Sequence, residues 1–169
     1  IAQNALIKYK GAWRRMEELE PKTGYENAIF YADYGHHPTE IKATVKAIKE
    51  KHGDRSVLLI FQPHQARRLE DLFKDFIDSF DSADELVLLP TYEVAGREAK
   101  ITKTSKNLCE EIINRNKSNK SNQSAYYLQS LEEALKIIQK QVVIFMGAGN
   151  IDSEVRKHFR SNLLYGKPR

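Results

Sequence analysis

Four short polar segments carry the residue types that could bind a ligand or take part in chemistry. They read DYGHHPTE (33–40), QPHQARR (62–68), PTYEVAGRE (90–98) and GAGN (147–150). Each follows an apolar run typical of a buried strand. Carboxylates, imidazoles and guanidinium groups that lie together can hold an anion, move protons or bind a metal. The shared position of these segments is the strongest functional signal in the sequence.

The adjacent pair His36 and His37 could ligate a metal, with His64 as a third ligand. Neighbouring residues that leave a strand tend to point in different directions, and the sequence has no HxxxH or HExxH spacing. We therefore expect no metal site. His37 stands just before Pro38, where a helix N-cap would lie. We interpret His37 as structural and His36 as a ligand contact.

The segment after the second apolar run places two arginines at the start of a predicted helix. Arg67 and Arg68 follow His64 there, and a cation in the first turn opposes the helix dipole. An arginine in this position is explained if it faces a carboxylate or a phosphate, whose geometry its fork matches. The alternative is a solvated charged turn. We expect at least one of the two arginines to bind an anionic ligand.

Nucleotide-binding motifs are incomplete in this chain. GAGN lacks the third glycine of a dinucleotide fingerprint, because position 152 is Asp, and it follows the last predicted strand. It is interpreted as a tight turn that lets a helix pack closely. No G-x-x-x-x-G-K-[ST] is present, so the sequence contains no P-loop. Arg14 and Arg15 precede the alternating pattern and could be a basic linker.

The elements that position these segments alternate between strands and helices. We predict strands at 28–33, 57–61, 85–89, 125–128 and 142–146, and helices from 38, around 67–80, around 108–113, over 130–140 and around 155–159. This alternation implies right-handed βαβ units and a three-layer, doubly wound α/β domain with a mostly parallel sheet. Ligands gather at the carboxyl ends of the strands in such a sheet. The four polar segments should therefore converge along one edge.

Composition limits the class of protein. The 169 residues suffice for one domain with a core, and 41% are apolar. No run approaches the roughly 18 apolar residues of a membrane span. The net charge of +4 is mild and mixed through the chain, which is weak evidence for nucleic-acid binding. Cys109 is the single cysteine, is predicted to be a buried small hydrophobe, and fits a reducing cytoplasm.

Two segments fall outside the alternation. Residues 116–124, NKSNKSNQS, have low complexity and are predicted to be a mobile surface connection. Residues 1–25 read as a short helix over 2–9 and an extended piece over 14–20. We interpret 1–25 as a junction with a neighbouring domain and 26–169 as the domain itself.

In order along the chain, DYGHHPTEI, LLIFQPHQARR, YEVAGRE and MGAGNI resemble the C-terminal domain of the Mur ligases. YKGAWRRMEE resembles the junction between that domain and the central ATP-binding domain. The resemblance implies a cytoplasmic, ATP-dependent ligase of peptidoglycan precursor synthesis, similar to the member that joins L-alanine to UDP-N-acetylmuramate through an acyl phosphate. The P-loop, the Mg²⁺ ligands and the UDP-sugar site would lie in two preceding domains. This chain would then be a closing domain, inactive alone, that excludes water from the acyl phosphate.

The resemblance also implies roles for individual residues on the nucleotide side. Arg15 resembles the arginine that reaches ATP from the domain junction. Asp33, with Tyr34 beside it, resembles the aspartate motif that contacts the nucleotide, and His36 lies on the amino-acid side of the same motif.

On the amino-acid side, His64 and Arg68 would hold the alanine carboxylate and stabilise the charge of the tetrahedral intermediate. Gln65 stands where many relatives have Arg, and it could still donate one hydrogen bond to that carboxylate. Arg67 could compensate for the missing charge. Ala32 stands where many relatives have a second Asp. No residue is assigned as a catalytic acid or base.

Two alternatives stay open. One is a sibling Mur-type ligase that attaches a recycled peptide in place of alanine. The other is a free-standing module that binds a nucleotide or an amino acid without chemistry. FQPH favours the alanine-adding type of ligase.

Overall fold

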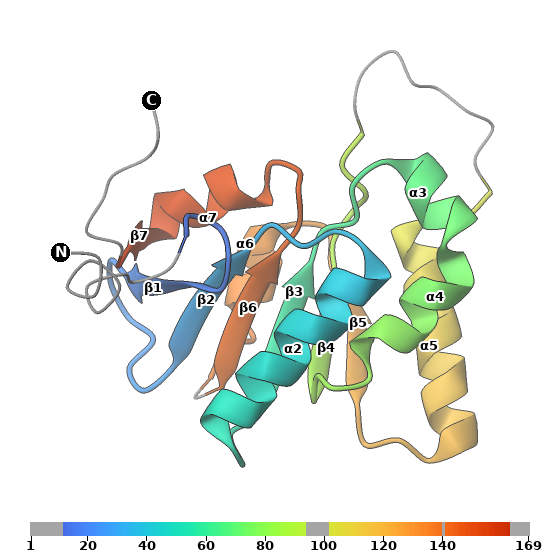
Figure 1. Cartoon of the computed structure of the whole chain (residues 1–169), viewed down its shortest axis with the longest axis horizontal. Coiled ribbons are helices and arrows are strands. Elements are labelled where there is room, and N and C mark those ends of the chain that lie inside the picture. Colours follow the sequence, from blue (N-terminus) through green and yellow to red (C-terminus); the bar gives the residue numbers. More distant parts are fainter. Residues whose placement is uncertain (1–11, 94–101, 140, 163–169) are drawn as a thin grey trace, which may run out of the picture.

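In the part of the chain that the structure describes, seven strands form one mixed sheet (Figure 1). The computed structural model describes residues 12–93, 102–139 and 141–162. The strand order across the sheet is β5-β4-β3-β6-β2-β1-β7. The strands are β1 (Glu17–Pro21), β2 (Ile29–Asp33), β3 (Val57–Phe61), β4 (Glu85–Leu88), β5 (Ser124–Tyr127), β6 (Val142–Met146) and β7 (Phe159–Ser161).

Five of these strands are parallel, and their carboxyl ends stand in one row. Met146 of β6 lies opposite Asp33 of β2 and Phe61 of β3. Leu88 of β4 lies opposite Phe61 on one side and Tyr127 of β5 on the other. This register confirms that the polar segments after β2, β3, β4 and β6 begin at the same edge of the sheet.

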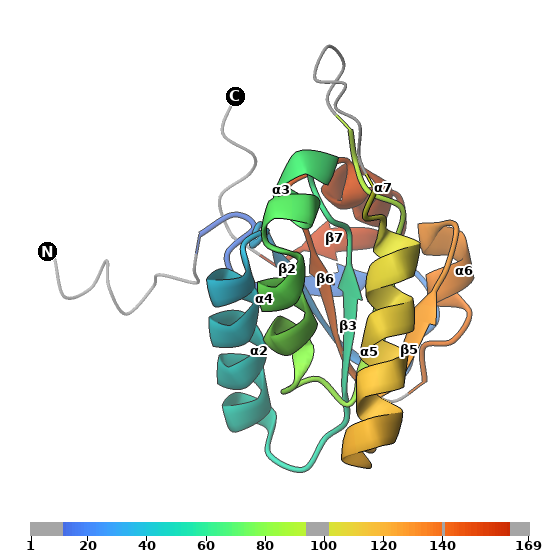
Figure 2. The same ribbon diagram turned by 90° about the vertical axis from the view of Figure 1, so that its right-hand side faces the viewer.

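Helices cover both faces, which confirms the three-layer α/β architecture. One face carries α2 (Pro38–His52), α3 (Ala66–Asp71), α4 (Phe73–Ile77), the 3-10 turn η1 (Asp78–Phe80) and α5 (Ser105–Asn119), all on the near side of the sheet in Figure 2. The other face carries α6 (Leu131–Leu135) and α7 (Ile151–His158). Alternate residues of β2, β3, β4 and β6 enter one of two apolar cores. In β3, for example, Leu59 faces the first core and Ile60 the second.

The edge beside β2 is antiparallel and was only partly predicted. The extended piece expected over 14–20 is β1, which pairs antiparallel with β2 and therefore belongs to the same sheet. The boundary expected after residue 25 stays a prediction, and the helix expected over 2–9 lies outside the described residues. The final helix was predicted to run to Phe159. Instead α7 ends at His158, and Phe159 begins β7, which pairs with β1.

Two further expectations were wrong in detail. The helix predicted around 67–80 is divided into α3, α4 and η1, because Leu72 leaves helical geometry at φ −110° and ψ 20°. Its apolar stripe survives the break, since Leu69, Phe73 and Phe76 are all buried. The connection predicted over 116–124 is helical as far as Asn119. Asn116 is buried there, and its side-chain amide donates to Gln123.

Cys109 is buried in α5, as predicted. Burial, with a smaller contribution from Glu110, raises the pKa of the Cys109 thiol to about 11. No helix in the described part of the chain has the length and apolar character needed to cross a membrane.

Candidate functional site

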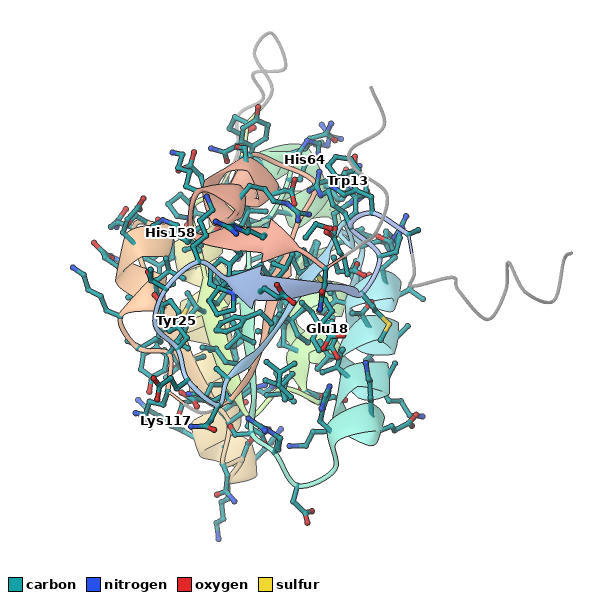
Figure 3. The ribbon with its side chains drawn as sticks, turned by 90° about the vertical axis from the view of Figure 1, so that its left-hand side faces the viewer. Trp13, Glu18, Tyr25, His64, Lys117 and His158 are labelled. Carbon is teal, nitrogen blue, oxygen red and sulfur yellow. The ribbon has the colours of Figure 1, made fainter. Side chains whose placement is uncertain are left out.

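The candidate site lies where the sheet changes its winding direction. β2 and β3 are followed by helices on one face, whereas β6, which lies between them, is followed by α7 on the other face. The loops after these strands therefore diverge, and doubly wound folds bind ligands at such a crevice. Figure 3 shows Trp13 and His64 at this end of the molecule and Lys117 at the opposite end.

His64 and Arg68 form a polar pair directly after β3. The Arg68 Nη1 atom lies 3.3 Å from His64 Nδ1 and donates to the His64 carbonyl oxygen at 3.3 Å. The His64 ring stacks on Tyr92, with 5.8 Å between ring centroids, and residues 64 and 92 form a β-bridge that extends the β3–β4 pairing. The His36 ring lies 6.1 Å from the His64 ring. The structure thus brings together His64 and Arg68, which the resemblance implies hold a carboxylate, and His36, which it places on the amino-acid side.

Gln65 and Arg67, two of the three residues between His64 and Arg68, do not share this arrangement. Gln65 adopts a φ of 66°, and its backbone amide donates to the Tyr92 carbonyl oxygen at 2.9 Å. Its side chain makes no capping bond to α3. The Arg67 guanidinium is 72% exposed and binds Asp71 through two contacts of 3.0 and 3.1 Å. Arg67 is therefore engaged one turn further along the helix, away from His64.

His37 is the N-cap of α2, as predicted. Its side chain accepts a hydrogen bond from the Thr39 amide, and Glu40 completes the capping box by accepting from the amides of His36 and His37 at 2.9 and 3.1 Å. Burial on its own raises the pKa of Glu40, but these two hydrogen bonds and the nearby His36 and Arg15 lower it overall. This cap fixes the backbone at His36, whose ring Nδ1 lies 3.1 Å from the Tyr34 carbonyl oxygen.

Asp33 ends β2 and is only 4% exposed. Its Oδ2 accepts from the Met16 amide at 2.8 Å, and its Oδ1 accepts from the Gly35 amide at 2.7 Å. A side chain at position 35 would place its Cβ 2.9 Å from that Oδ1, so glycine is needed at this turn. In this conformation Asp33 holds the segment before β1 against the end of β2.

Tyr34 lies beside the two arginines that precede β1. Its ring is 4.6 Å from the Arg14 guanidinium carbon and 5.8 Å from that of Arg15, and the residue is 37% exposed. The Arg15 side chain is 55% exposed and lies 3.6 Å from Glu40. Of the residues predicted to face a nucleotide, Arg15 and Tyr34 are therefore accessible, whereas Asp33 is covered.

A buried group of charges underlies this part of the site. Glu17 is fully buried, and its carboxylate accepts two hydrogen bonds from Arg156, at 2.7 and 2.8 Å, and one from the Arg14 amide at 2.8 Å. Asp152 contacts Arg156 at 3.1 Å and Arg14 at 3.7 Å. Burial raises the pKa of Glu17, but hydrogen bonds from Arg156, Ser161 and the Arg14 amide outweigh it and lower the pKa below its usual value.

Gln62 joins the loops after β3 and β6. Its Nε2 donates to Asn150 Oδ1 at 2.9 Å, and its Oε1 accepts from the Ile151 amide at 3.1 Å. A Cβ at Gly149 would lie 2.5 Å from Gln62 Oε1 and 2.6 Å from the Tyr92 side chain, which confirms that GAGN is a close-packing turn. Because a neutral amide already caps α7, and Asp152 and Glu154 lie in its first turn, this helix start is not arranged to receive a phosphate.

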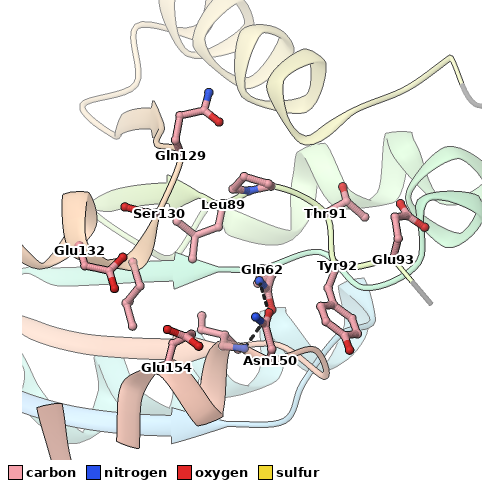
Figure 4. Close-up of a pocket in the computed structure, with 13 residues that line it drawn as sticks. Gln62, Leu89, Thr91, Tyr92, Glu93, Gln129, Ser130, Glu132, Asn150 and Glu154 are labelled. Carbon is pink, nitrogen blue, oxygen red and sulfur yellow. Dashed lines mark hydrogen bonds between the residues drawn. The ribbon is translucent and has the colours of Figure 1, made fainter. Parts of the chain in front are cut away.

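A cavity of about 310 Å³ opens on the α6–α7 side of this turn (Figure 4). Gln62, Tyr92 and Asn150 form part of its wall, together with three carboxylates from Glu93, Glu132 and Glu154. No lysine or arginine lines it among the described residues. Tyr92 lies between this acidic cavity and the His64–Arg68 pair, and of the three carboxylates that of Glu154 is already paired with Lys157 at 2.5 Å.

The described ranges contain no group of three His, Cys, Asp or Glu side chains arranged to hold a metal. What the site offers is a guanidinium and two imidazoles at one edge, with an exposed tyrosine and a second arginine nearby. Such a set can bind and orient anionic groups. The roles of Tyr92, Gln62 and Arg14 could not be predicted from the sequence, since each contacts residues far away in the chain. Only the basic dipeptide Arg14–Arg15 could be recognised there.

Fold and site together define a domain of a known class of ligases. Residues 14–149 match the family described as "Mur ligase, glutamate ligase domain", and the chain belongs to this family. Among known proteins, it is similar to the UDP-N-acetylmuramate–L-alanine ligase of Hydrogenobaculum sp. (strain Y04AAS1), with 35% identity over 154 residues that cover 89% of this chain and 32% of the relative. The enzyme of the same name from Rickettsia felis is 36% identical over 159 residues, or 89% and 31% of the two chains.

Solved structures agree with this assignment. The UDP-N-acetylmuramate–alanine ligase of Thermotoga maritima superposes with a TM-score of 0.61 at 26% identity, over 91% of this chain and 31% of that one. A murein peptide ligase from Psychrobacter arcticus gives a TM-score of 0.59 at 24% identity, over 92% and 31%, and at this identity it shows the fold alone. The chain thus spans about a third of the length of the curated relatives it matches.

Proposed function

We propose that the chain is the C-terminal domain of an ATP-dependent ligase that joins L-alanine to UDP-N-acetylmuramate. The observation that carries the proposal is the His64–Arg68 pair at the carboxyl edge of β3, facing His36. An arginine braced by a neighbouring imidazole presents a carboxylate-binding fork at a fixed place. The similarity to several enzymes that carry this name supports L-alanine as the amine substrate.

In the proposed reaction, ATP phosphorylates the substrate carboxylate, the alanine amine attacks the acyl phosphate, and phosphate leaves. Arg68 and His64 bind the alanine carboxylate, and His36 lies beside them. Gln65 could add one hydrogen bond, although its side chain would have to turn toward the pair. Closure of the domain excludes water from the acyl phosphate, which would otherwise hydrolyse.

On the nucleotide side, we propose that Arg15 and Tyr34 contact ATP. Asp33 is almost fully buried beneath the segment that contains Met16, so it can do so only if that segment moves away. We propose that Mg²⁺ is bound mainly by a preceding domain, because this chain corresponds to only about a third of the length of the ligases it resembles. For the same reason we expect the 169-residue chain on its own to show no ATP turnover, and sustained phosphate release from it would contradict this division of roles.

The test is a matched pair of substitutions in the full-length ligase. Arg68→Ala removes a charge-assisted contact worth about 1.5–3 kcal/mol, so the KM for L-alanine should rise roughly ten- to hundredfold while that for UDP-N-acetylmuramate stays within about twofold. Arg67→Ala removes the same charge one residue earlier, where the guanidinium binds Asp71, and should leave both constants near wild type. Equal effects of the two variants, or normal alanine kinetics in Arg68→Ala, would refute the clamp.

The acidic cavity favours one second candidate. A space of about 310 Å³ with three carboxylates is larger than the methyl side chain of alanine requires. It would suit the cationic end of a longer amine substrate, as in a sibling ligase that attaches a recycled peptide. Competition between L-alanine and the tripeptide L-alanyl-γ-D-glutamyl-meso-diaminopimelate in a phosphate-release assay separates the two. Preferential use of the tripeptide would replace L-alanine as the proposed substrate.

A further inference from the structure

The two adjacent arginines before β1 occupy different environments. The Arg15 side chain is 55% exposed, whereas that of Arg14 is only 11% exposed. Arg15 can therefore reach a ligand from solvent, but Arg14 cannot do so in this conformation. A buried arginine without a ligand role of its own needs another explanation, because removal of its charge from water is unfavourable.

Arg14 contacts the segments that follow two neighbouring strands. Its Nη2 donates to the Gly147 carbonyl oxygen at 2.5 Å, at the end of β6. Its guanidinium carbon lies 4.6 Å from the Tyr34 ring, and its own carbonyl oxygen accepts from the Tyr34 amide at 2.8 Å, just past β2. One residue thus links the turn after β2, through both ring and backbone, to the turn after β6.

The backbone of Arg14 is held as firmly as its side chain. Arg14 adopts a φ of 53°, a region that non-glycine residues rarely occupy, and its amide donates to Glu17 at 2.8 Å. Strained conformations of this kind persist where the surroundings fix them, and they cluster at functional sites. The nearby Asp152, 3.7 Å away, partly compensates the buried charge.

We infer that Arg14 is a positioning residue for the nucleotide side of the site: it sets the Tyr34 ring and the Gly147 turn in a fixed relation to each other. The inference rests on the proposed function, in which Tyr34 faces ATP. Arg14 acts through Tyr34 and contacts neither ATP nor L-alanine itself. The adjacent arginines therefore have different roles. Arg15 contacts the nucleotide, and Arg14 orders the surface on which the nucleotide binds.

The experiment compares Arg14→Lys and Arg14→Gln with Arg156→Gln in the full-length ligase. Arg156 is a suitable control because it is similarly buried, at 15% exposure, and belongs to the same charge group, yet it contacts Glu17 and Asp152 instead of Tyr34 or Gly147. Both Arg14 variants should raise the KM for ATP by roughly tenfold, the effect of about one hydrogen bond. The KM for L-alanine should change less than about twofold.

Arg14→Lys keeps the charge and most of the volume, so it tests the guanidinium geometry even if Arg14→Gln fails to fold. A normal KM for ATP in the folded Arg14 variants would overturn the inference. So would an equal rise in Arg156→Gln, since this would show a general effect of stability. A failure of the proposed function is distinguishable, because the wild-type ligase would then release no phosphate in response to L-alanine.

Discussion

The Glu17–Arg156 ion pair should stabilise the fold, and this prediction does not depend on the proposed function. Glu17→Gln keeps the shape of the side chain but removes the charge that faces Arg156 through two hydrogen bonds. Breaking a buried pair on one side costs about 3–5 kcal/mol, because the remaining charge is left uncompensated. At about 2–4 °C per kcal/mol for a domain of this size, the melting temperature of the 169-residue chain should fall by about 6–20 °C.

Glu18→Gln is the matched control. Glu18 is the next residue of β1 and is exposed, so the same change of charge there should move the melting temperature by less than about 2 °C. Thermal unfolding followed by circular dichroism at pH 7 compares the two variants with the wild type. If Glu17→Gln melts within about 2 °C of the wild type, the pair does not stabilise the domain and the reasoning is refuted.

The same pair should give a pH dependence with a defined sign. The pKa of Glu17 is lower in the folded chain than its usual 4.5, so below that pH the unfolded chain binds more protons than the folded one. The stabilisation is therefore fully present above about pH 5 and is lost as the pH falls through the lowered pKa. The difference in stability between the wild type and Glu17→Gln should shrink over that acidic range. A difference that stays constant from pH 6 to pH 3 would contradict the lowered pKa.

Two further predictions concern Cys109 and Gly149. Cys109 is buried, and its pKa is raised to about 11. A thiol reagent at pH 8 should therefore modify the folded chain at less than about a hundredth of the rate measured after unfolding in urea. Comparable rates in the two states would show that the thiolate is accessible. Gly149→Ala places a Cβ about 2.5 Å from Gln62 Oε1 and 2.6 Å from the Tyr92 side chain. The free energy of unfolding, measured by urea titration, should therefore fall by about 1–3 kcal/mol. An unchanged urea midpoint would show that the turn has room for the methyl group.

Local pattern was sufficient to predict most of the fold. The continuous apolar runs VLLIF and VVIFM became buried parallel strands, and His37 became the predicted N-cap of the helix that begins at Pro38. Each of these depends on residues within one element or one turn. The short strand β7 had no such signal, because Phe159 continues the apolar spacing of α7 and only its pairing with β1 ends the helix there.

The site was predictable in its residue types but not in its contacts. The sequence indicated that His36, His64 and Arg68 converge, because all three follow strand ends. The sequence could not indicate that both carboxylate oxygens of Asp33 accept hydrogen bonds from backbone amides, since one of these amides belongs to Met16, 17 positions earlier. Arg14 and Gly147 are 133 positions apart, and a separation of this size leaves no local pattern to detect.

The hydrogen bonds of Gln62 affect how tightly the carboxyl edge of the sheet can bind a ligand. The Gln62 side-chain amide donates to Asn150 and accepts from the Ile151 amide at the start of α7, so the loops after β3 and β6 are held together by protein contacts alone. Ordering a loop during association lowers affinity through lost conformational entropy. Because the loops after β3 and β6 are ordered before a ligand arrives, much of this entropy loss is avoided. Modest contacts from a small molecule such as an amino acid can then suffice for binding at this edge.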